Sequence, residues 1–120
     1  MKNIEKLDIL AVEFQECQDV LTAIGVQTRQ SIIIALMAAG CEEGMRVGEI
    51  TERTHLSRPA VSHHLKILKD AKVVSVHREG TKNFYYLDPN KSTIRLLKNL
   101  VKHIEEVMVN YWPSQRKKVR

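Results

Sequence analysis

Apolar residues recur at steps of three and four along most of this chain, which is the spacing of amphipathic helices. Over residues 4–24 the series consists of Leu7, Leu10, Phe14, Cys17, Leu21 and Ile24. Acidic residues flank this heptad-like seam, which is too short for a free-standing coiled coil. We therefore expect one helix that packs against another helix and ends at Gly25.

A second helix is predicted after Thr28, whose hydroxyl can cap the first turn. Its apolar residues lie on most sides of the helix: Ile32, Ile33, Leu36 and Met37. Because the helix is apolar on most sides, we expect it to be central to the core. Gly40 is suited to ending it, and residues 41–44 then form a loop.

A short helix is predicted over residues 46–54. After a tight connection, a second helix follows over residues 57–69. Ser57 is a good N-cap, and Pro59 falls in the first turn, where a missing N–H costs nothing. The apolar stripe consists of Val61, Leu65 and Leu68, with Ala60, His64 and Ile67 beside it. Two helices joined in this way predict a helix-turn-helix over residues 46–71.

The opposite face of this last helix is basic and rich in hydrogen-bonding groups. It carries Arg58, Ser62, His63, Lys66 and Lys69. A solvated helix face usually mixes both signs of charge, yet no carboxylate occurs on this helix before Asp70. The pattern favours a polyanionic partner, and an ordinary exposed face is the simpler alternative. His64 lies on the apolar side, where we expect it to be structural.

Two runs rich in branched and aromatic residues follow, over residues 73–78 and 83–87. Gly80 can take a positive φ in the turn between them. A hairpin directly after a helix-turn-helix is a wing, here residues 73–87. The alternative is a structural hairpin whose charged turn only improves solubility.

Ser92 can cap a last helix, which extends to about Tyr111. Its apolar positions again step by three and four: Ile94, Leu97, Leu100 or Val101, Ile104, Val107, Met108 and Tyr111. Within one chain no other helix remains to cover the seams of residues 4–24 and 92–111. We therefore expect these two helices to pair with each other and with their copies across a two-fold axis. Residues 113–120 form a basic tail.

The charge of the chain is divided unevenly along its 120 residues, which suffice for a single domain with a core. Residues 1–56 hold 5 basic and 9 acidic side chains, whereas residues 57–120 hold 14 and 5. The basic second half should attract phosphates. An aromatic content of 5% argues against a stacking platform for single-stranded nucleic acid.

Several classes of protein are disfavoured by what the sequence lacks. No apolar run approaches the roughly 18 residues of a membrane span, and the first residues lack a signal-peptide pattern. Two cysteines are too few for a disulfide framework. We expect a cytoplasmic protein with reduced thiols.

With these motifs in place, the chain resembles the arsenic-repressor (ArsR) family of small bacterial winged-helix dimers. The family's pattern at the recognition helix is matched by Leu56, Ser57, Val61, Ser62, His64, Leu65 and Leu68. Its wing pattern is matched at Gly80 and at residues 84–86. The resemblance is close over about residues 20–90, and covers the flanking helices only by length and position.

The resemblance implies a mainly helical (α+β) winged helix-turn-helix in which four helices precede a β-hairpin and a fifth helix. It also implies a homodimer through the first and last helices, which represses transcription by occupying an operator. Arg58 is suited to contacting a guanine, Ser62 and His63 a base or a phosphate, and the lysines phosphates. The predicted DNA contacts are Ser57, Arg58, Pro59, Ser62, His63, Lys66, Lys69, Arg78, Thr81 and Lys82.

Metal sites that occur in the family do not match this sequence. Residues 45–53 contain no cysteine, and the segment after Asp88 contains no histidine. His103 and Glu106 have a suitable spacing but stand alone, and a metal needs three or four ligands. We predict no zinc site and no cofactor.

Some members sense oxidants or persulfides through two thiols. Cys41 fits the position of one, and Cys17 is the only candidate for the other, because the last helix has no cysteine. The alternative for Cys17 is a small buried apolar residue, since it lies in the seam of the first helix. Thiol sensing is therefore a weak hypothesis.

Two other functions compete with DNA binding. A winged-helix module that binds proteins usually has a less basic recognition surface or exposes apolar residues there, and this chain shows neither. An enzyme is disfavoured because the sequence contains no Gly-rich phosphate loop and no convincing pair of acid and base.

Overall fold

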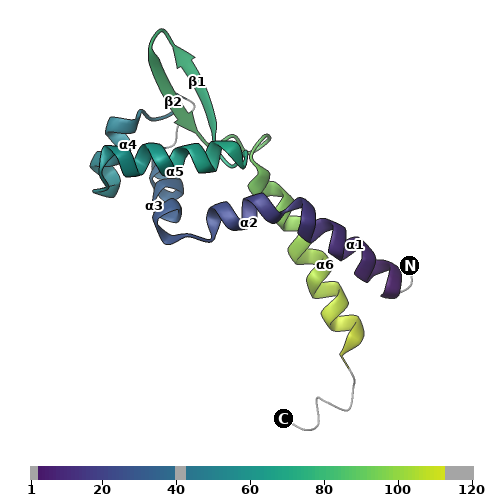
Figure 1. Ribbon diagram of the computed structural model, residues 1–120. Helices are drawn as coiled ribbons and strands as arrows, with labels where there is room; N and C mark the ends of the chain where they lie inside the picture. Colours follow the sequence, from purple (N-terminus) through teal and green to yellow (C-terminus); the bar gives the residue numbers. More distant parts are fainter. Residues whose placement is uncertain (1–2, 40–42, 113–120) are drawn as a thin grey trace. The chain divides into compact units, whose positions relative to one another are not determined.

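The computed structural model describes residues 3–39 and 43–112, and Figure 1 shows its elements. In chain order they are α1 (Asn3–Glu16), α2 (Gln18–Ile24), α3 (Gln27–Ala38), α4 (Val47–Thr54), α5 (Arg58–Asp70), β1 (Ser75–Glu79), β2 (Lys82–Tyr86), the 3-10 helix η1 (Thr93–Arg95) and α6 (Leu96–Tyr111). Within the predicted single domain, α1 and α6 form one compact unit and residues Asp19–Arg95 form another.

In the second unit, α3 packs against α4 and α5, and α4 packs against α5. The largest fully buried side chains are Val20, Ile32, Leu36, Ile50, Val61, Leu65, Leu68 and Val73. The prediction that α3 is central to the core is thus confirmed for most of its apolar residues. It is wrong for Met37, which is 59% exposed, because the unbroken apolar run of residues 32–39 gives no signal for the outward side of the helix.

The start of α3 also differs from the prediction. Its N-cap is Val26, in extended conformation and without a capping side chain, so Thr28 lies inside the helix and not at its cap. The last turn of α2 lies just before this point. Gln30 of α3 donates its Nε2 proton to the carbonyl oxygen of Ile24 at 2.8 Å. The junction is therefore fixed by side chains of α3 that satisfy carbonyl groups of α2.

Strands β1 and β2 form the predicted hairpin, with Ser75 opposite Tyr86 and Glu79 opposite Lys82. The connection is the two-residue turn Gly80-Thr81, shorter than predicted, and Gly80 has the expected positive φ of +62°. Met45 forms an isolated antiparallel bridge with β2, in which its N–H and C=O each bond to the backbone of Tyr85 at 2.8 Å. The hairpin is thereby fixed to the segment before α4.

In the first unit, α1 packs against α6. Leu10, Cys17 and Leu100 are buried there. The prediction of one helix over residues 4–24 is wrong, since α1 ends at Glu16 and α2 starts anew at Gln18. The described residues consequently contain six α-helices where five were expected.

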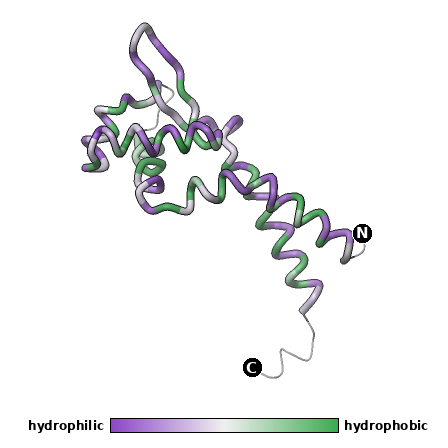
Figure 2. Tube along the Cα trace, in the orientation of Figure 1, coloured by the Kyte–Doolittle hydropathy of each residue, from purple (hydrophilic) through white to green (hydrophobic). Residues whose placement is uncertain are grey.

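The start of the last helix is a short 3-10 turn before α6 (Figure 1). Ser92 accepts the N–H of Ile94 at 3.3 Å, as a capping residue does, and its hydroxyl donates to the carbonyl of Val73 at 2.6 Å. Along α1 and α6, Figure 2 shows apolar residues alternating with polar ones. Large apolar side chains of this unit stay exposed in the single chain: Leu7, Ile9, Val12, Phe14, Val101, Met108, Val109, Tyr111 and Trp112.

None of the described helices is long and apolar enough on its own to cross a membrane. Helices α2 and α3 reach that length and composition only as a pair, which is bent by 89°.

Candidate nucleic-acid interface

The helix α5 begins as its sequence predicts. Ser57 is the N-cap, in extended conformation, and its Oγ accepts the N–H of Ala60 at 3.2 Å. Pro59 lies in the first turn. Val61, Leu65 and Leu68 are fully buried, so the predicted apolar stripe is confirmed. These local features fix which face of α5 turns away from the core.

The outward face of α5 is exposed along its length. Its members are Ser57, Arg58, Pro59, Ser62, His63, Lys66 and Lys69. Within residues 3–39 and 43–112, the side chains of Arg58 and Lys69 form no hydrogen bond or ion pair, so their charged groups can reach a partner. We refer to these seven residues as the α5 face.

Arg58 lies close to the first turn of α4. A Cβ built on Gly48 would come within 3.2 Å of the Nη2 atom of Arg58, which shows that the guanidinium lies next to this glycine. The absence of a side chain at Gly48 gives the arginine room at the junction of α4 and α5. Its planar group of donors can bind the acceptor edge of a guanine or a phosphate.

Lys66 differs from the other cations of the face because it has a partner. Its Nζ lies 2.8 Å from Oδ2 of Asp70, one turn later on α5, and both side chains are exposed. The hydrogen bond raises the pKa of Lys66 and lowers the pKa of Asp70. A phosphate would have to compete with this carboxylate for the ammonium group.

The tip of the hairpin carries the other predicted contacts, Arg78, Thr81 and Lys82, all of which are exposed. The Nε of Arg78 donates to the carbonyl oxygen of Gly80 at 2.8 Å, so the side chain folds back over the turn. At the base of the hairpin, the ring of His77 stacks on Phe84 with a centroid distance of 5.2 Å. This stacking supports the hairpin below its charged tip.

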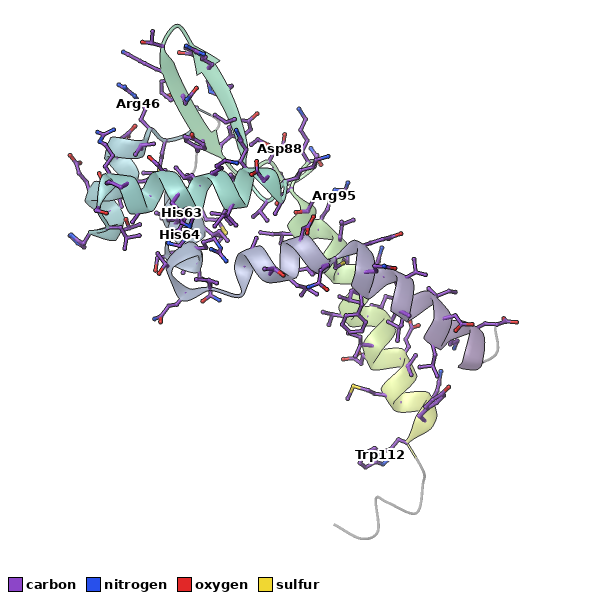
Figure 3. All side chains as sticks on the ribbon, in the orientation of Figure 1. Arg46, His63, His64, Asp88, Arg95 and Trp112 are labelled. Atoms are coloured by element: carbon purple, nitrogen blue, oxygen red, sulfur yellow. The ribbon has the colours of Figure 1, made fainter. Side chains whose placement is uncertain are left out.

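Arg46 is a basic residue that the sequence analysis did not single out. It is exposed at the N-cap of α4, and Figure 3 shows it beside the hairpin. Its backbone N–H donates to Oε1 of Glu49 at 3.2 Å. The neighbouring bridge between Met45 and Tyr85 explains its position, and this pairing has no signal in the sequence.

The two histidines of α5 are separated as the helix wheel predicts. His63 is exposed on the α5 face, whereas His64 is half-buried and its Nδ1 lies 3.3 Å from Nη1 of Arg29 on α3. Burial, followed by the charges of Arg29 and His63, lowers the pKa of His64. The structural role expected for His64 agrees with this contact.

The candidate metal ligand His103 has a different partner. Its Nδ1 lies 2.7 Å from Oε1 of Glu13, so the pair joins α6 to α1. Over residues 3–39 and 43–112, no three histidine, cysteine, aspartate or glutamate side chains gather where they could hold a metal ion.

Of the two candidate sensor thiols, Cys41 lies outside the described residues. Cys17 is buried, 3% exposed, and its Sγ lies 4.0 Å from the carbonyl oxygen of Leu96. Burial, and then the charges of Glu13 and Glu16, raises the pKa of its thiol. Both effects count against Cys17 as an oxidant sensor, because the thiolate is the reactive form.

We predict that Cys17 is protected in the folded protein. In a Cys41→Ser variant, where it is the only thiol, labelling by a disulfide reagent at pH 8 should be at least about tenfold slower than for the same variant unfolded in guanidinium chloride. The unfolded sample is the internal control. Equal rates in the two samples would show that Cys17 is accessible.

Residues 27–76 match the family described as "Bacterial regulatory protein, arsR family". An uncharacterised HTH-type transcriptional regulator of Methanocaldococcus jannaschii is 32% identical over 95 residues, which cover 79% of this chain and 98% of that protein. The transcriptional repressor SdpR of Bacillus subtilis is 40% identical over 70 residues, covering 58% of this chain and 73% of the repressor.

Solved structures share the fold. One is the homodimeric winged helix-turn-helix DNA-binding domain of a possible ArsR-family regulator from Mycobacterium bovis. It superposes with a TM-score of 0.59 at 20% identity, covering 86% of this chain and 92% of that domain. At this identity the likeness concerns the fold alone, and the fold is the winged helix-turn-helix.

Proposed function

This chain belongs to the ArsR family of bacterial regulatory proteins, which are DNA-binding transcriptional regulators, and from this we propose that it represses transcription as a homodimer bound to an inverted-repeat operator. The observation that carries the proposal is the α5 face, exposed on a helix whose other side is fully buried. Such a protein works in the cytoplasm, where the DNA is.

In the proposed complex, α5 lies in the major groove with its N-terminal half at the base edges. Arg58 contacts a guanine, and Ser62 and His63 contact a base or a phosphate. Lys66 and Lys69 meet phosphates, which set the register and carry no sequence information. The hairpin tip, with Arg78, Thr81 and Lys82, contacts the phosphates or the minor groove beside them.

The proposed dimer uses the unit formed by α1 and α6. This unit leaves large apolar side chains exposed, among them Val101 at 59% and Met108 at 65%. Apolar surface of this kind on a small unit favours association with a second copy. The related domain from Mycobacterium bovis is homodimeric, which supports the same assembly here. Two α5 helices related by the dyad would then lie about 34 Å apart, one turn of DNA.

The function is tested by selecting duplexes from a random DNA library with the purified protein. We expect enrichment of an inverted repeat whose half-sites have centres separated by about 10 base pairs or a multiple of that. No enrichment over a library carried through without protein would remove the proposal of operator binding. Enrichment of a single half-site would contradict the proposal that the protein binds DNA as a dimer.

The roles of the α5 face and of the hairpin tip can be separated by one pair of substitutions. Replacing Arg58 by Ala should weaken binding to the selected duplex by about 10- to 100-fold and change binding to unrelated DNA much less. Replacing Lys82 by Ala is the matched control. It should weaken both kinds of binding similarly and reduce the slope of log affinity against log salt by about one.

Both variants remove an exposed cation, so their melting temperatures should match that of the original protein. Fluorescence anisotropy at several salt concentrations gives the affinities. Unchanged affinity and unchanged sequence preference in Arg58→Ala would show that α5 does not dock with its N-terminal half at the bases.

A further inference from the structure

A buried arginine lies where α2, α3 and α5 meet. Arg29 of α3 is only 7% exposed. Arginine is almost never buried to this degree unless its donors are satisfied, since an unpaired buried charge is costly. Its partners therefore indicate what the side chain does.

Two of these partners belong to the end of α2. The Nε of Arg29 donates to the carbonyl oxygen of Ala23 at 2.6 Å, and Nη2 donates to that of Thr22 at 3.2 Å. The last carbonyls of a helix have no partner within the helix. Arg29 thus closes the C-terminal end of α2, and the positive charge also suits the negative end of the helix dipole.

The third partner is on α5. Nη1 of Arg29 lies 3.3 Å from Nδ1 of His64. A guanidinium can only donate, so Nδ1 of His64 must accept, and the proton of the neutral ring must be on Nε2. A protonated His64 would instead direct an N–H group at the guanidinium. The contact exists only while His64 is neutral.

The surroundings of His64 keep it neutral. Burial lowers its pKa most, followed by the charge of Arg29 from α3 and then by His63 on α5 itself. Among the described side chains of α4 and α5, no carboxylate contributes to the shift. Because the folded-state pKa lies below the unfolded value of about 6.5, the stabilisation is complete above that pH and is lost as the pH falls toward the folded-state pKa.

His64 is adjacent to a residue of the α5 face. The rings of His63 and His64 meet edge to face with their centroids 5.2 Å apart. A change in how His64 is held therefore changes the presentation of His63. The same applies to Ser62, which precedes it on the helix.

We propose that Arg29 is a positioning residue for DNA recognition, which holds α5 through neutral His64, and that protonation of His64 releases this hold. The inference rests on the proposed use of α5 as the helix that contacts bases. Beyond that function, the inference assigns a role in DNA recognition to Arg29 and His64, which do not touch DNA. It also makes the sequence preference depend on pH.

The test compares affinities for the duplex selected by the original protein and for an unrelated duplex of equal length, at pH 7.5 and pH 5.5 in the same salt. The ratio of the two is the sequence preference. Because the pKa of His64 lies below 6.5, we expect the preference of the original protein to fall, by up to about tenfold, as the pH is lowered from 7.5 through that folded-state pKa. Arg29→Met should have the reduced preference at both pH values.

His64→Gln is the decisive variant. The amide oxygen of glutamine can accept from Arg29 as Nδ1 does, but the side chain does not titrate. We expect this variant to keep its preference at pH 5.5. His63 and His55 are present in both proteins, so the comparison of the two reports on the ring of His64. Equal pH dependence of the two proteins would overturn the proposal.

Gln30→Met is the matched control for a purely structural effect. Gln30 also bonds to the end of α2, through the carbonyl oxygen of Ile24, but its side chain forms no hydrogen bond with α5 in the part of the chain that the structure describes. It should lower the melting temperature without changing the preference or its pH dependence. A loss of preference equal to that of Arg29→Met would mean that the end of α2 matters and His64 does not.

An NMR titration of the His64 ring separates this inference from the proposed function, because it needs no DNA. The pKa of His64 should rise toward its ordinary value in Arg29→Met, or in Arg29→Gln if the first variant does not fold. Failure of the original protein to select any duplex would remove the proposed function. A His64 titration that is the same in the Arg29 variant as in the original protein would contradict the role of Arg29 and leave the proposed function unaffected.

Discussion

A Val101→Asp/Met108→Asp variant is expected to be monomeric and to bind the selected duplex at least about 100-fold more weakly than the original protein. The two side chains are 59% and 65% exposed on α6, and seven residues apart they lie on the same side of the helix. A carboxylate at each position would have to lose its water in the proposed dimer interface, which is costly. In the single chain both carboxylates stay in solvent.

The loss of DNA binding follows from the loss of the second α5 helix. In a dimer, binding of the first half-site makes binding of the second intramolecular, with an effective concentration in the millimolar range. A monomer has no such advantage. Sedimentation and fluorescence anisotropy measure the two quantities, and circular dichroism checks that the helices remain.

The control is Asn99→Asp/Asn110→Asp, which adds the same charge on the same helix. Both residues are exposed, and at 100° per residue Asn99 lies about 180° from Met108, and Asn110 about 180° from Val101. This control should remain a dimer with unchanged affinity. A dimeric Val101→Asp/Met108→Asp protein, or a monomeric one with full affinity, would exclude the proposed interface.

The helix-turn-helix was predictable because its signals are local. Ser57 and Pro59 mark the start of α5, and the period of Val61, Leu65 and Leu68 gives its inner side. Each signal lies within one or two turns of the residue that it concerns, so the prediction needs no knowledge of the rest of the fold.

The break between α1 and α2 could not be predicted in this way. The apolar steps of three and four continue through Cys17, and neither proline nor glycine interrupts them. The break occurs where the thiol is buried against the carbonyl of Leu96, 79 residues later. Tertiary packing of this kind overrides a local pattern, and periodicity cannot detect it.

Arg29 was missed for a related reason. A helix wheel places apolar residues inward and expects a charged residue to face solvent. Here the arginine is buried because three acceptors from α2 and α5 converge on it. Only the arrangement of these helices shows that the acceptors are present.

The base of the hairpin depends on a glycine, Gly44, that no local pattern along the chain singles out. Gly44 has φ +87°, and a Cβ there would lie 2.9 Å from the carbonyl oxygen of Tyr85 and 3.1 Å from Cβ of Phe84. Such a Cβ meets backbone and strand atoms, which cannot move aside as a flexible side chain would. The close approach allows the neighbouring Met45 to bond to β2.

Gly44→Ala is therefore expected to lower the free energy of unfolding by about 2–4 kcal/mol, from the unfavourable positive φ together with overpacking against β2. Gly80→Ala is the matched control. It has a similar positive φ of +62°, but nothing lies within 4 Å of a Cβ there, so only the conformational cost of about 1–2 kcal/mol applies. Urea unfolding at one protomer concentration measures both variants. The difference between them isolates the packing of residue 44 against the hairpin, and equal losses would show that β2 yields to the added methyl group.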